Sequence, residues 1–209
     1  MNRLFAPPSL DDLIHLLRAW RFWVLGALIG ALLGAGLHLL APPPYEARAT
    51  VNVDFNLEEA WPDETDRQQF YYLERETRKL EEIAWSDAVL KAAAQASGSN
   101  VETLRSGSLL LAQPAEAGWH FYARAEDAGR AQELAASWAQ AFTEAAEADL
   151  RTEGGLNSFI RLELTQTEGL PVERSLPLST YLLTGVLTAW TLGAFAMLFG
   201  RRGLKAEAG

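Results

Sequence analysis

Residues 22–41 read FWVLGALIGALLGAGLHLLA, twenty consecutive residues without an aspartate, glutamate, lysine or arginine. A helix of that length rises about 30 Å, the thickness of the hydrocarbon core of a bilayer. Residues 178–200, LSTYLLTGVLTAWTLGAFAMLFG, form a second uncharged run of 23 residues. A buried helix of a soluble protein is rarely apolar on every side over such a length. The two runs therefore predict two transmembrane helices.

Basic residues gather at the outer ends of the two runs. Three precede residue 22 and three follow residue 200: Arg3, Arg18, Arg21, Arg201, Arg202 and Lys205. Three acidic residues leave segments 1–21 and 201–209 at +3 together, and because the whole chain carries −9, the remainder carries −12. Lysine and arginine concentrate on the cytoplasmic side of membrane helices. We therefore expect a two-pass protein of the cytoplasmic (inner) membrane, with both termini in the cytoplasm and residues 42–177 outside it.

A cleaved signal peptide is the alternative interpretation of the first run. The run ends in Leu39-Leu40-Ala41, and three prolines follow. Proline directly after a small residue is a poor context for cleavage, so we favour an uncleaved anchor with a short amphipathic lead-in over residues 1–21. The chain has no cysteine, which excludes disulfides and thiolate ligands but does not decide the compartment.

Between the two runs, the spacing of apolar residues changes from that of strands to that of helices and back. Residues 45–55 carry an apolar residue at every second position, which predicts a strand with one buried face. Helical spacing covers residues 66–96, with a break at Ser86-Asp87, and residues 127–152, before Gly154-Gly155. Shorter strands are expected at residues 108–113, 119–125 and 156–167.

The order of these elements is strand, helices, strand, strand, helix and strand, the βαββαβ pattern of ferredoxin-like folds. Short connections then place the first and last strands side by side and antiparallel. The start of the first and the end of the last lie at one edge of the sheet, where both membrane helices join the domain. The sequence thus predicts an α+β, ferredoxin-like domain anchored between two transmembrane helices.

This layout resembles the Wzz-type chain-length determinants, also called polysaccharide co-polymerases. Four stretches carry the resemblance. They are the lead-in LDDLIHLLRAWRFWVLG, the first strand YEARATVNV, the helix-to-strand run WSDAVLKAAAQASGSNVETLRSGSLLLAQ, and the strand and helix WHFYARAEDAGRAQELAASWAQAFTE. The resemblance in layout extends over nearly the whole chain, although each motif is loose.

The chain departs from the family pattern in two places. Many members insert a long helical hairpin, whereas here Gly154-Gly155 ends the third helix, and of the proline-rich approach to the second span only Pro171 and Pro177 remain. It resembles a short, base-domain-only member. The resemblance implies a non-catalytic scaffold that sets the chain length or export of a surface polysaccharide (O-antigen, capsule or exopolysaccharide). It also implies a homo-oligomer that contacts lipid and a polymerase or export protein.

Two other functions are compatible with the sequence. Similar proteins activate a separate bacterial tyrosine kinase through a cytoplasmic tail, which here would be residues 201–209 and contains no tyrosine. A ligand-sensing domain of a two-span receptor is the second alternative, although no cytoplasmic output module is visible in the sequence.

The sequence offers little for catalysis. His15, His38 and His120 are not paired at metal-ligand spacing, and neither a GxxxxGK[ST] loop nor a GxSxG motif is present. We therefore expect neither an enzyme nor a cofactor or metal site. An acidic loop offers oxygen ligands for Ca²⁺, but a solvated charge run explains it better because the EF-hand spacing is missing: Glu58, Glu59, Asp63, Glu64 and Asp66. The −12 domain repels nucleic acid.

Tryptophans are the candidates for stacking on sugar rings. Trp119 and Trp138 fall on the inward faces of their strand and helix, which favours the core. Trp61, in the acidic loop, is the better candidate for a glycan contact.

Small residues recur every four positions in both runs: Gly26, Gly30 and Gly34 in the first, and Gly185, Ala189 and Gly193 in the second. Such faces allow two helices to approach closely. The contact joins either the two helices of one protomer or neighbouring protomers, and the sequence does not decide between these.

Overall fold

The computed structural model describes residues 14, 18–60, 66–113, 118–166 and 168–207. The chain divides into two compact units. The first contains Met1–Pro43 and Leu176–Gly209, and the second is Pro44–Ser175. The predicted lead-in over residues 1–21 lies almost entirely outside the described residues.

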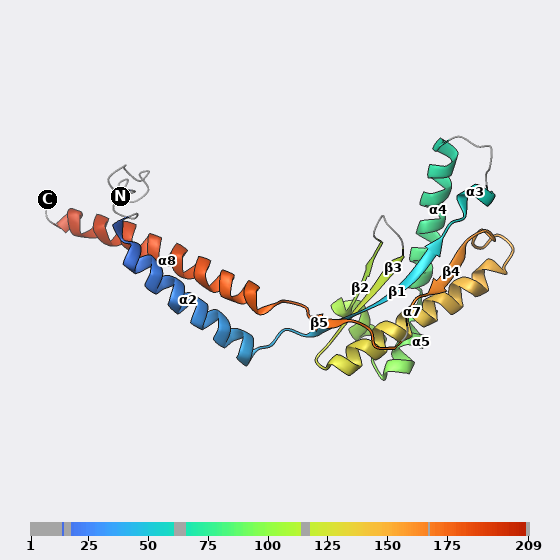
Figure 1. Cartoon of the computed structure of the whole chain (residues 1–209), viewed down its shortest axis with the longest axis horizontal. Helices are drawn as coiled ribbons and strands as arrows, with labels where there is room; N and C mark the ends of the chain where they lie inside the picture. Colours follow the sequence, from blue (N-terminus) through green and yellow to red (C-terminus); the bar gives the residue numbers. More distant parts are fainter. Residues whose placement is uncertain (1–13, 15–17, 61–65, 114–117, 167, 208–209) are drawn as a thin grey trace. The chain divides into compact units, whose positions relative to one another are not determined.

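Two helices form the described part of the first unit. Helix α2 covers Trp20–Leu40 and helix α8 covers Leu178–Glu207, and the two pack against each other (Figure 1). Trp20–Leu40 and Leu178–Met197 are long and apolar enough to cross a membrane. Most of their apolar side chains are exposed, as lipid-facing residues would be. Helix α8 continues seven residues beyond the predicted span, through part of segment 201–209.

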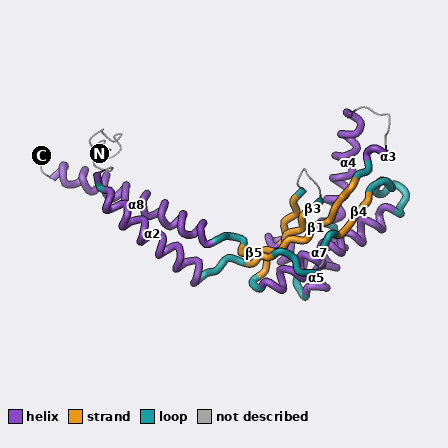
Figure 2. The backbone as a smooth tube through the Cα atoms, viewed as in Figure 1, coloured by secondary structure: helices purple, strands orange, loops and turns teal. Residues whose placement is uncertain are grey.

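The second unit is built on a small antiparallel sheet. Its strands are β1 (Tyr45–Asp54), β2 (Leu109–Ala112), β3 (Trp119–Ala125), β4 (Arg161–Leu164) and β5 (Val172–Arg174). Their order is β2-β3-β1-β4, and β5 pairs with the first residues of β1 (Figure 2). Neighbours are antiparallel throughout. The prediction that the first strand pairs antiparallel with the strand after the third helix is confirmed by the β1–β4 pair.

The helices of this unit are α3 (Leu57–Ala60), α4 (Asp66–Ala84), α5 (Asp87–Ser97), α6 (Val101–Thr103) and α7 (Ala128–Leu150), with a π-helical turn, η1, at Leu104–Ser108. The predicted break at residues 86–87 is confirmed. Ser86 caps α5 by accepting a hydrogen bond from the Val89 N–H, and Asp127 caps α7 in the same way at Arg130.

Aromatic side chains fill the core between α7 and the sheet. Trp138 is fully buried, stands edge-on to Phe121 at a centroid distance of 4.8 Å, and donates from Nε1 to the Ala84 carbonyl at 2.9 Å. Trp119 stacks on Phe142 at 5.6 Å. These contacts tie α4, α7 and β3 together, and they confirm that Trp119 and Trp138 are core residues.

The chain between α7 and β4 differs from the prediction. Helix α7 ends at Leu150, before Gly154-Gly155, and β4 begins at Arg161 instead of residue 156. Side-chain oxygens capture the backbone N–H groups in between: Asp149 accepts from Leu156 at 2.8 Å, and Asn157 accepts from Phe159 at 3.0 Å. Such local bonds compete with strand pairing, which explains the shorter strand.

Strand β5 was not expected. It follows Pro171, whose carbonyl accepts a hydrogen bond from the Arg48 N–H at 3.3 Å. Arg174 secures the other end of β5, since its guanidinium lies 3.9 Å from the centroid of the Tyr45 ring and donates to the Tyr45 hydroxyl at 3.0 Å. A proline is tolerated beside an edge strand because it lacks only the donor that faces away from the sheet.

A buried carboxylate fixes the irregular segment onto α4. Glu76 is fully buried, and its Oε2 accepts the Asn157 N–H at 3.0 Å. Lys79 Nζ lies 3.4 Å from the other Glu76 oxygen and donates to the Gly155 carbonyl at 2.6 Å. Burial and the neighbouring Glu76 carboxylate raise the pKa of Tyr72, one turn earlier, to about 12. The sequence pattern does not predict that Glu76 is buried, because the other residues on this face of α4 are apolar and indicate ordinary core packing.

We expect Glu76→Ala to lower the free energy of unfolding by about 3 kcal/mol, because it leaves the Asn157 N–H and the Lys79 ammonium without their buried acceptor. Glu82→Ala removes an exposed carboxylate from the same helix and should change stability by less than about 0.5 kcal/mol. Denaturant unfolding of the full chain in detergent, followed by tryptophan fluorescence, measures both. Equal effects of the two substitutions would contradict this role for Glu76.

Candidate functional site

The glycines of the two apolar runs face each other within one chain. A Cβ added at Gly30 would lie 2.4 Å from the Gly185 carbonyl oxygen, and a Cβ added at Gly185 would lie 2.1 Å from the Gly30 carbonyl oxygen. Neither distance is possible for a real side chain. At this crossing the two helices therefore touch backbone to backbone, and only glycine fits on either side.

The other small residues extend this contact in both directions. A Cβ at Gly34 would lie 2.2 Å from the Tyr181 carbonyl oxygen, whereas at the opposite end a Cβ at Gly193 would lie 2.8 Å from the Phe22 ring. Gly26 is looser, with the Trp190 ring 3.6 Å from the position of its Cβ. Trp190 also donates from Nε1 to the Trp23 carbonyl at 2.9 Å.

All six predicted small residues thus lie in or beside the contact between α2 and α8, since the Ala189 methyl is 2.9 Å from a Cβ built at Gly30. The structure describes a contact within one chain. That the same residues also join neighbouring protomers stays a prediction.

The uncovered face of the sheet carries the charged residues of the strands. Helix α7 packs on the other face, where Ala47, Ala49 and Val51 of β1 are buried. On the uncovered face, Arg48 of β1 lies directly opposite Tyr122 of β3. Glu46 lies between Arg124 on one side and Glu173 on the other. This period-two division was predicted for β1 and is confirmed by its burial.

His120 is on the same uncovered face. Its Nδ1 lies 3.0 Å from the Thr50 hydroxyl, and its ring meets Tyr122 edge-on at a centroid distance of 6.1 Å. Partial burial, helped by the charge of Arg48, lowers the pKa of His120 below its ordinary value. His120 thus contacts the Tyr122 ring, two residues further along β3, from one side.

The described residues of the second unit line at least three cavities. The largest of these three, about 680 Å³, is at the end of β3 and is lined by Asn100, Ser108, Arg124 and Arg130 among others. A second, of about 240 Å³, is on the uncovered sheet face and is lined by Glu46, Arg48, Tyr122, Pro171 and Glu173.

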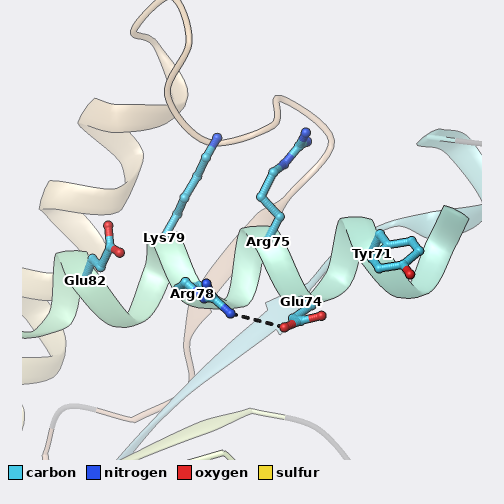
Figure 3. Close-up of a pocket in the computed structure, with 6 residues that line it drawn as sticks. All are labelled: Tyr71, Glu74, Arg75, Arg78, Lys79 and Glu82. Carbon is cyan, nitrogen blue, oxygen red and sulfur yellow. Dashed lines mark hydrogen bonds and ion pairs between the residues drawn. The ribbon is translucent and has the colours of Figure 1, made fainter.

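The third cavity, about 270 Å³, follows one face of α4 (Figure 3). Its cations are already engaged. Arg78 donates to Glu74 at 3.1 Å, Arg75 donates to the buried Glu76 at 2.8 Å, and Lys79 holds the Gly155 carbonyl. Arg75 and Lys79 extend to the same side of the helix in Figure 3. Because these cations already bind groups of the protein, the residues that line this cavity stabilise the packing of α4 and are weak candidates for ligand binding.

The remaining predicted site residues divide between the two units and the undescribed segments. Pro171 lines the cavity on the sheet face, and the Pro177 carbonyl accepts from the Thr180 N–H at 3.0 Å at the start of α8. Trp61, together with Asp63 and Glu64 of the acidic loop, lies outside the described residues. Within the described ranges, no three histidine or acidic side chains gather in a geometry that holds a metal ion.

The role of the glycine contact is tested with two glycines of the same helix. The chain has no cysteine, so Phe22→Cys with Gly193→Cys gives a unique pair for a short bis-maleimide crosslinker. Gly30→Leu should lower the intramolecular crosslinking yield severalfold, because overpacking a close contact costs about 1–3 kcal/mol. Gly36→Leu is the matched control, since no atom lies within 4 Å of its Cβ position.

Equal yields for Gly30→Leu and Gly36→Leu would contradict packing of α2 on α8. The mass of the detergent-solubilised protein, measured on the same two variants, addresses the contact between protomers. A loss of oligomer with Gly30→Leu alone supports that contact, and an unchanged mass rejects it.

Comparison with known proteins adds no relative. The chain matches no family model, and no curated protein and no solved structure is significantly similar to it.

Proposed function

We propose that this chain is a non-catalytic membrane scaffold that modulates the chain length or the export of a surface polysaccharide. The resemblance to Wzz-type chain-length determinants suggests the process, and the architecture is of the kind such a scaffold needs. A scaffold acts through the position of its domain relative to the membrane and to its neighbours. It therefore requires firm attachment more than a reactive site.

One observation carries this proposal: the two ends of the second unit are joined to each other. The Ser175 N–H donates to the Pro44 carbonyl at 3.0 Å, and Tyr45 pairs with Arg174 in the sheet. In sequence, four residues separate α2 from β1 and three separate β5 from α8. A domain whose two chain ends meet at one point can be held by two adjacent helices without strain.

The fold proposed for this domain is ferredoxin-like. The sheet order β2-β3-β1-β4 with antiparallel neighbours is the order of that fold, and it supports the assignment. Strand β5 is an addition that pairs with the first residues of β1 and precedes the second apolar helix in sequence. The absence of a long insertion between α7 and β4 supports a base-domain-only member of the family.

We also propose that α2 and α8 cross the cytoplasmic membrane with both termini inside. Every backbone N–H and C=O must be paired in lipid, and a helix satisfies this requirement internally. The −12 segment would then lie outside and the +3 ends inside, as the distribution of lysine and arginine favours. Assembly of several copies, and contact with a polymerase or export protein, belong to the same proposal.

The orientation is tested by labelling single cysteines in the cysteine-free chain. Lys91→Cys, in the exposed part of α5, should react with a membrane-impermeant maleimide in intact spheroplasts. Ala208→Cys, near the C-terminus, should react only after lysis. Labelling of Ala208→Cys in intact spheroplasts would overturn the topology and, with it, the scaffold proposal.

The function is tested by deleting the gene and analysing surface polysaccharide by gel electrophoresis. We expect a shift in the modal length of the glycan ladder or in its amount, because the scaffold that limits polymerisation or export is lost. The wild-type gene supplied on a plasmid should restore the ladder, and the Gly36→Leu variant should do so equally well. An unaltered ladder in the deletion strain would contradict the proposal.

A further inference from the structure

The cavity on the uncovered sheet face is made by three neighbouring chain segments. Arg48 of β1 lies opposite Tyr122 of β3, and on the other side of β1 the segment Pro171–Glu173 completes the wall. Its volume, about 240 Å³, is below the range of about 300–1,000 Å³ typical of drug-sized ligands. The cavity therefore suits a single small ring.

Two carboxylates face each other in this cavity. Glu46 and Glu173 are directly opposite in the β1–β5 pair, an arrangement that destabilises a sheet when the charges are equal. Arg124 offsets part of this cost, because its Nε donates to Glu46 Oε2 at 2.6 Å. In the described part of the chain, Glu173 has no ion pair or hydrogen bond through its carboxylate. Acceptor capacity thus remains on both sides of the β1–β5 pair.

Donors and an apolar surface stand beside these acceptors. The Arg48 guanidinium makes no hydrogen bond or ion pair within the described residues, so its N–H groups are available. Tyr122 adds an aromatic ring with a polar end, held edge-on against His120. A ligand with C–H groups on its faces and hydroxyls around its edge matches the carboxylates, the guanidinium and the aromatic ring. Its hydroxyls can donate to the carboxylates and accept from the guanidinium, and its C–H faces can pack on the ring. A sugar ring is such a ligand.

The charges in and around the cavity favour an uncharged sugar. The two carboxylates are balanced by Arg48 and Arg124, so the cavity has no net charge to attract an ion. The surrounding segment carries −12 in total, which repels anionic sugars at low ionic strength. An uncharged sugar ring needs no net charge in the cavity and is not repelled by the acidic segment.

A larger cavity at the end of β3 adjoins the cavity at Tyr122 through an ion pair. Arg124 lines that larger cavity while its ion-pair partner Glu46 lines the smaller one, so the Glu46–Arg124 pair is their shared wall. The larger cavity adds the Asn100 amide, the Ser108 hydroxyl and the Arg130 guanidinium. Successive sugars can follow this path from Tyr122 over Arg124.

We propose that the cavity at Tyr122 on the uncovered sheet face binds one ring of an uncharged glycan, and that the following units pass over Arg124 toward Arg130 at the start of α7. This inference deepens the proposed function and rests on it, because it assigns a glycan-binding surface to the scaffold. Tyr122 supplies the stacking surface, Arg48 the donor, and Glu46 and Glu173 the acceptors.

The test is calorimetric titration of the full chain in lipid nanodiscs with maltohexaose and chitohexaose as uncharged probes. Hexagalacturonate, CaCl₂ and putrescine are the anionic and cationic comparisons. We expect an uncharged hexasaccharide to bind, and Tyr122→Ala to weaken it by about tenfold, a loss within the range of one aromatic contact. Tyr122→Phe should retain the affinity within about threefold, and Arg48→Gln and Glu173→Gln should each weaken binding.

Tyr71→Ala on α4 is the control, because Tyr71 lies outside the proposed binding surface and, like Tyr122, has arginine nearby. Its affinity should equal that of the wild type. The proposal is overturned if neither uncharged probe binds at millimolar concentration, if Tyr71→Ala weakens binding as much as Tyr122→Ala, or if only the cations or the anionic probe bind. These outcomes are independent of the deletion strain, so an altered ladder without sugar binding would refute this inference and leave the scaffold function standing.

Discussion

The pairing of β1 with three other strands is the interaction on which the domain depends. In ten residues, β1 hydrogen-bonds to β3 along one side and to β4 and β5 along the other. Among the strands of the described residues, β2 alone does not pair with β1 and joins the sheet through β3. Because β5 pairs with the first residues of β1, the start and the end of the domain are held together. The same strand therefore organises the core and closes the domain where the chain enters and leaves it.

Period-two and helical spacing predicted most of this domain, because both follow from burial of one face. Residues 45–54 and 119–125 alternate cleanly, and the break between α4 and α5 is marked by a capping serine. The segment 151–160 could not be predicted in this way. Its course is set by Glu76 and Asp149, whose oxygens bind N–H groups distant in sequence or across a turn. Strand β5 was missed because three residues after a proline carry too little pattern.

Four-residue spacing in the apolar runs predicted which residues make close contacts but not which helix they meet. Spacing identifies a face of one helix, whereas the partner depends on the alignment of two helices, which sequence periodicity does not contain. The structure aligns Gly30 with Gly185, where each backbone occupies the space of the other's missing side chain. Gly36, on the same helix, has open space instead, which shows that glycine content alone does not identify a contact.

The division of β1 into two faces also separates stability from recognition. Ala47, Ala49 and Val51 are fully buried against the helical layer, while the intervening Arg48 and Thr50 belong to the uncovered face. The small alanines let α7 lie close to the sheet, so the core gains its density from Trp138 and Phe142 on the helix. Substitutions at Arg48 or Tyr122 consequently leave the core packing intact. Two carboxylates opposite each other across one strand pair lower the stability of the domain. The packing of the core on the other face offsets this loss, because the two faces do not share side chains.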